Sequence, residues 1–111
     1  MPVRGGRGDT DGAGLEAMQL LIDGMMSGTG IRDRINGGYI DPEALGLSSP
    51  LVDDLRIWLS RYEDAHYAGF DDAEVVSMLD RQGVALAERM TKELTSDKVG
   101  YYSNAHLKEL E

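Results

Sequence analysis

The stretch from Phe70 to Leu94 constrains the fold most, because it combines a helix start signal with a long apolar stripe. Asp71 can accept hydrogen bonds from the amides of a first helical turn, while Glu74 can reach back to the Asp71 amide. Apolar side chains then recur at three- and four-residue steps, which places them on one helical face. Gly83 lies on that face, where it costs up to about 1 kcal/mol relative to alanine. The sequence therefore predicts a central helix that another element approaches closely at Gly83.

A second helix is predicted from Ser49 to about His66. Serine is a good capping residue and Pro50 is tolerated at the first helical position, so the start is well marked. An apolar stripe continues along this segment, and the connection to the next helix is short, which implies an antiparallel pair. Trp58 is the largest side chain on the stripe, and we expect it to fill the space over Gly83 and Ala87.

Two segments have the character of β-strands. Residues 15–22 carry a partial alternation of apolar side chains, and Lys98–Ser103 has the valine and tyrosine content of a strand that can pair with them. The intervening Gly28–Leu47 reads as a structured loop, with one helical turn capped by Asp41. The predicted fold is α+β: an antiparallel helix pair packed on a small sheet of two to three strands, in the order β-loop-α-α-β.

The length of 111 residues allows one domain with one modest core. We expect that domain at residues 15–103. Residues 1–14 contain five glycines and almost no apolar side chains, which predicts a flexible tail. The polar residues 104–111 are predicted to form a flexible C-terminal tail.

The charge balance limits the possible partners. The chain has 20 acidic and 11 basic side chains, and its formal charge of −9 repels nucleic acid and favours either simple solubility or a basic protein partner. Cysteine is absent, which excludes disulfides and thiolate metal sites. No apolar run reaches the roughly 20 residues of a membrane span, and no signal pattern opens the chain. These features predict a cytoplasmic protein without membrane contact.

No pattern predicts a catalytic residue, a cofactor or a metal ion. The glycines between residues 28 and 38 do not match a phosphate-binding loop, and no serine has a nearby base. His66 and His106 are not spaced as metal ligands. We therefore expect a non-enzymatic protein. The alternative is a small metal-dependent hydrolase that uses the carboxylates around Asp71, because oxygen ligands there can hold a hard cation.

Acidic and aromatic side chains form the predicted partner-binding surface. Four carboxylates bracket the turn between the helices, and aromatic side chains supply much of the binding energy at protein interfaces. Successive strand residues face opposite ways, so one of Tyr101 and Tyr102 is expected to be exposed. A homodimer through unprotected strand edges is a further possibility. The predicted contact residues are Tyr39, Glu63, Asp64, Tyr67, Asp71, Asp72 and Tyr102.

Three segments, Gly37–Ala65, Gly83–Leu94 and Val99–Ser103, resemble parts of short acidic bacterial proteins of uncharacterised function. In those proteins an apolar strand precedes a Gly-Gly, Asp-Pro-Glu-x-Leu-x-Leu-Ser segment and a Leu-x-x-Trp helix. Some of them are loosely similar to the immunity partners of secreted bacterial toxins. The resemblance implies an immunity or antitoxin-like inhibitor, and it supplies no site residues.

Overall fold

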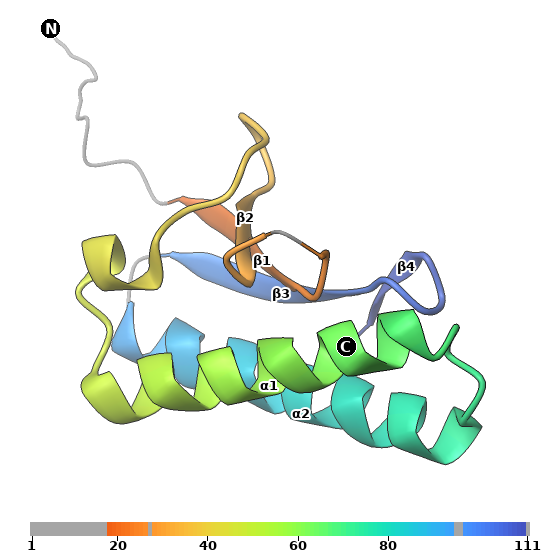
Figure 1. The fold of residues 1–111 in the computed structure, drawn as a ribbon. Coiled ribbons are helices and arrows are strands. Elements are labelled where there is room, and N and C mark those ends of the chain that lie inside the picture. Colours follow the sequence, from red (N-terminus) through yellow and green to blue (C-terminus); the bar gives the residue numbers. More distant parts are fainter. Residues whose placement is uncertain (1–17, 27, 95–96, 111) are drawn as a thin grey trace, which may run out of the picture.

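The computed structural model describes residues 18–26, 28–94 and 97–110. A four-stranded sheet carries two long helices on one face, which confirms the predicted α+β class (Figure 1). No helix in these ranges is both long enough and apolar enough to cross a membrane. The elements are β1 (Gln19–Asp23), β2 (Ile31–Asp33), the 3-10 helix η1 (Pro42–Leu45), α1 (Ser49–Tyr67), α2 (Ala73–Glu93), β3 (Lys98–Ser103) and β4 (Lys108–Leu110).

The sheet is mixed and has the strand order β2-β1-β3-β4. The central strands β1 and β3 are parallel, with Ile22 opposite Tyr101, and each has an antiparallel neighbour at its outer edge. The strand predicted at Lys98–Ser103 is confirmed with its bounds. The first strand begins at Gln19 and extends to Asp23, whereas the predicted residues 15–17 lie outside the described ranges.

The prediction of two to three strands was wrong because both edge strands have only three residues. Such a strand is too short to show the alternation that identifies β-structure in a sequence. β4 also corrects the predicted C-terminal tail, since residues 104–110 form a turn and this strand. Leu107 has a φ of 57° in that turn. Arg34 then ties β4 to the rest of the sheet, because its guanidinium bonds both carboxylate oxygens of Glu109 at 2.5 and 2.8 Å. The predicted tail at residues 1–14 lies outside the described ranges.

The core lies between the helices and the inner face of the sheet, and Gly83 is buried where α2 packs on β3. A Cβ atom at Gly83 would lie only 2.1 Å from Cε1 of Tyr101, so the predicted close approach is confirmed. The element that approaches Gly83 is β3, through the ring of Tyr101. The expectation that Trp58 fills the space over Gly83 was therefore wrong. Trp58 is buried beside the Tyr101 ring instead, with the ring centroids 5.8 Å apart, and its Nε1 donates to the Leu79 carbonyl at 2.8 Å.

Both helix starts are shifted by one residue relative to the sequence-based expectation. Asp72, not Asp71, caps α2, because its carboxylate accepts from the amides of Glu74 and Val75. At α1 the capping position belongs to Ser48, whose hydroxyl donates to Glu93 at 2.6 Å. This contact joins the start of α1 to the end of α2 and helps to hold the pair antiparallel.

Candidate functional site

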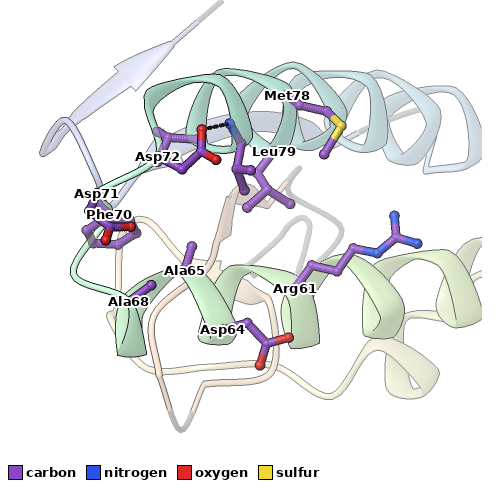
Figure 2. Close-up of a pocket in the computed structure, with 11 residues that line it drawn as sticks. Arg61, Asp64, Ala65, Ala68, Phe70, Asp71, Asp72, Met78 and Leu79 are labelled. Carbon is purple, nitrogen blue, oxygen red and sulfur yellow. Dashed lines mark hydrogen bonds between the residues drawn. The ribbon is translucent and has the colours of Figure 1, made fainter.

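A groove between the two helices begins at the turn that connects them (Figure 2). It encloses about 280 Å³ and has an apolar floor. Ala65 and Leu79 are buried in that floor, whereas Val75 and Met78 stay 38% and 39% exposed. We call this feature the interhelical groove; it is lined by Arg61, Asp64, Ala65, Ala68, Phe70, Asp71, Asp72, Val75, Val76, Met78 and Leu79.

Three carboxylates stand at the rim of the interhelical groove. Asp64 comes from α1, whereas Asp71 and Asp72 come from the connection before α2. Arg61 is the only cation among the described residues that line the groove, and it extends from α1 towards the space between the helices (Figure 2). The turn end of the groove therefore has an acidic rim around an apolar floor.

Five of the seven predicted contact residues belong to this end of the helix pair. The rim carboxylates line the groove, and two further predicted residues lie on the last turns of α1: Glu63 is half-buried and Tyr67 is 79% exposed. The clustering was expected, because all five residues are close together in the sequence.

The other two predicted contact residues belong to the sheet side of the molecule. Tyr102 is half-buried on the sheet face turned away from the helices, where the Arg32 guanidinium lies 5.1 Å from its ring centroid. Tyr39 bridges to Arg32 beside β2, and burial together with the nearby Asp23 carboxylate raises the pKa of Tyr39. The predicted surface is thus divided between the helix turn and the sheet.

A second cavity of about 280 Å³ continues the groove along the helix pair and shares Arg61 with the first. Ile57 is half exposed at its edge, and the side of Trp58 forms part of its wall. Asp54 and Arg89 form an ion pair across it at 2.7 Å, which joins α1 to α2. The acidic character therefore belongs to the turn end, whereas the distant end is bridged by opposite charges.

The geometry gives the hydrolase alternative no support. The carboxylate of Asp72 is engaged as the cap of α2, and the ring of His66 packs on Phe70 with centroids 4.6 Å apart. His66 does not line the groove with the carboxylates. Within the described ranges, no three histidine, aspartate or glutamate side chains are grouped so that they could hold a metal ion.

A buried carboxylate that the sequence reasoning missed lies on the sheet side of α2. Asp80 is 5% exposed, and its oxygens accept from the hydroxyls of Tyr101 at 2.5 Å, Ser103 at 3.0 Å and Tyr62 at 3.2 Å. His106 Nε2 lies 3.6 Å from the same carboxylate. The signal in the sequence was an acidic residue within the apolar stripe, between Leu79 and Gly83. We call these groups the Asp80 network: Asp80, Tyr62, Tyr101, Ser103 and His106.

Asp80 also lines a cavity that encloses about 470 Å³ between α2 and β4. Its other walls combine basic and apolar side chains. We call this cavity the β4 pocket; it is lined by Ser77, Asp80, Arg81, Val84, His106, Lys108 and Leu110.

The Asp80 network predicts a loss of stability in alkaline solution. Burial and the nearby Asp80 carboxylate raise the pKa of Tyr101, and burial also raises the pKa of Tyr62. In the unfolded chain both phenols ionise near pH 10, whereas in the folded protein they ionise only at higher pH. Stability is therefore full below about pH 10 and falls above it, by up to about 1.4 kcal/mol per pH unit for each tyrosine. Urea unfolding from about pH 8 to about pH 11.5 measures this slope.

Two tyrosine variants separate this effect from general alkaline damage. Tyr101→Phe should reduce the slope above pH 10 by about 1.4 kcal/mol per pH unit, because the proton that the folded protein retains on Tyr101 is removed. Tyr67→Phe is the matched control, since that phenol is 79% exposed, and should leave the slope unchanged. Equal slopes in the parent protein and the Tyr101→Phe variant would contradict the prediction.

Comparison with known proteins assigns neither site. No protein-family model matches the chain, and no curated protein matches its sequence. The interhelical groove and the β4 pocket must therefore be interpreted from their own geometry.

Proposed function

We propose that this chain is a non-enzymatic interaction module that binds a basic protein partner in the interhelical groove. The observation that supports this proposal is an exposed apolar floor bordered by three carboxylates. The expected ligand is a protein segment that presents an apolar side chain flanked by lysine or arginine. An immunity or antitoxin-like inhibitor is the form of such a module that the sequence resemblance suggests.

The apolar floor would supply the attraction at the centre of the contact. Each Å² of apolar surface removed from water is worth about 25 cal/mol, so covering Val75 and Met78 with one large side chain would be favourable. Met78 is flexible and polarizable, which lets it adapt to the shape of the entering group. The floor is already held in place by the buried Ala65 and Leu79, so little ordering is needed on binding.

The carboxylates would select the sign of the partner's charge. In the described part of the chain, Asp64 and Asp71 form no ion pair and are exposed to solvent. The formal charge of −9 adds a long-range field that speeds the approach of a basic surface and is screened by salt. We therefore expect an association rate that falls as salt rises.

Titration with two designed helical peptides tests the proposal. Both carry leucines along one face, flanked by lysines in one peptide and by glutamates in the other. We expect only the lysine peptide to bind, to shift the NMR signals of Val75 and Met78, and to lose affinity as salt rises. The double change Asp64→Lys with Asp71→Lys should weaken this binding about tenfold.

A charge-matched control excludes a general effect of net charge. The double variant Asp53→Lys with Glu88→Lys changes the net charge by the same amount, but at two exposed carboxylates outside the interhelical groove. Its affinity for the lysine peptide should stay within about twofold of that of the parent protein. Comparable affinity for both peptides, or signals of Val75 and Met78 that do not move, would contradict the proposal. Light scattering on the same samples would show a dimer if a second copy of the chain occupies the groove, which would also contradict it.

A further inference from the structure

The β4 pocket lies between α2 and the edge strand β4. Ser77, Arg81 and Val84 follow one another at helical spacing on one flank of α2. Lys108 and Leu110 pair with Ser103 and Tyr101, so they face the helix side of the sheet. These two walls enclose about 470 Å³, which is within the usual range of small-molecule pockets.

The hydrogen-bonding capacity of the buried acid in this pocket is already largely used by its own surroundings. One oxygen of Asp80 accepts from the hydroxyls of Tyr101 and Tyr62, and the other accepts from Ser103 with His106 close by. A carboxylate has about four acceptor positions, so Asp80 has little capacity left for a ligand.

The groups that remain available to a ligand are cationic. Lys108 and Arg81 both line the pocket, and only one nitrogen of the Arg81 guanidinium is used in a described contact, donating to Ser77 at 2.8 Å. Arg81 and Lys108 therefore place two cations in one pocket of a chain with a formal charge of −9, and this pair is complementary to an anion.

One part of the pocket is apolar. Val84 and Leu110 are half-buried, and both pack against the edge of the core without being covered by it. A ligand that carried only charge would leave these side chains in contact with water. A ligand with an apolar body would cover them while its charged end met Arg81 and Lys108.

We infer that the β4 pocket binds a small organic anion with an apolar body. A carboxylate or phosphate would lie against Arg81 and Lys108, and the apolar body would pack on Val84 and Leu110. This site is separate from the interhelical groove, since the two cavities share no lining residue. It therefore does not depend on the protein-binding proposal.

Titration of the full chain with three small probes tests the inference. Octanoate carries the expected anion and apolar body, octylamine reverses the charge, and acetate lacks the apolar body. We expect octanoate to bind and to shift the methyl signals of Val84 and Leu110. Octylamine and acetate should each bind at least tenfold more weakly.

Paired variants locate the binding. Arg81→Gln with Lys108→Gln should weaken octanoate binding at least tenfold, because both cations are removed. Arg56→Gln with Lys92→Gln removes two exposed cations outside the pocket and should leave the affinity within twofold. Equal binding of octylamine, unchanged affinity in the pocket variant, or shifts at Met78 in place of Val84 and Leu110 would each overturn the inference.

Discussion

Replacing Asp80 with alanine should lower the free energy of unfolding by about 3–5 kcal/mol. The carboxylate is the shared acceptor for the hydroxyls of Tyr101, Ser103 and Tyr62, so its removal leaves buried donors without a partner. It also leaves a cavity between α2 and β3. Asp80→Asn keeps one acceptor oxygen and should lose about half as much. Urea unfolding at neutral pH measures both losses.

The control for this prediction is another acidic residue on the same helix. Glu88 is exposed, and Glu88→Ala should change the free energy of unfolding by at most about 0.5 kcal/mol. An Asp80→Ala variant that unfolds at the same urea concentration as the Glu88→Ala variant would show that the Asp80 network does not stabilise the fold.

Replacing Gly83 with valine should cost about 3 kcal/mol or more. A Cβ atom at this position would lie 2.1 Å from Cε1 and 2.6 Å from Cδ1 of Tyr101. The ring cannot move away easily, because its hydroxyl donates a hydrogen bond to Asp80 at 2.5 Å and the buried ring makes a T-shaped contact with Trp58. The larger valine side chain must therefore push α2 away from β3. Gly83→Ala should lose about 2 kcal/mol, since its gain in helix propensity offsets part of the clash.

Ala85 provides the matched position for this test, two residues further along α2 and exposed. Ala85→Val introduces the same side chain without a clash and should cost only about 0.5 kcal/mol of helix propensity. Thermal or urea unfolding that gave equal losses for Gly83→Val and Ala85→Val would contradict the close packing of Tyr101 on α2.

The helices were predictable from sequence because each has a long apolar stripe and clear end signals. The apolar stripe predicted which face of α2 is buried, including Gly83. The end signals predicted the first and last residues of the helix to within one residue. The choice between Asp71 and Asp72 as the cap could not be made, because adjacent aspartates offer the same chemistry. The structure selects Asp72, whose carboxylate accepts from the amides of Glu74 and Val75.

The edge strands could not be predicted because their stability comes from contacts distant in sequence. β4 is held by pairing with β3 and by the contact of Arg34 with Glu109, which lie 75 positions apart. β2 forms within a glycine-rich loop and pairs with β1 through only three residues. Neither segment carries the longer alternation by which a strand is identified.

The two candidate sites also differ in how far they could be predicted from the sequence. The acidic rim of the interhelical groove was predictable, because Asp64, Asp71 and Asp72 surround one turn of the chain. The β4 pocket was not, because it combines α2 with a strand that was expected to be a tail. Asp80 was the available clue, since a carboxylate within an apolar stripe implies buried hydrogen-bond donors on another element.

Site-specific photocrosslinking from the groove floor tests the proposed function most directly. A photoreactive residue replaces Met78 in the interhelical groove, or Glu88 outside it, and the crosslinked segment of the partner is sequenced by mass spectrometry. We predict that the Met78 position captures a segment with an apolar residue flanked by lysine or arginine. Adding Asp64→Lys and Asp71→Lys should abolish the capture. Capture of an acidic segment, capture only from the Glu88 position, or capture that survives both charge reversals would contradict the proposal.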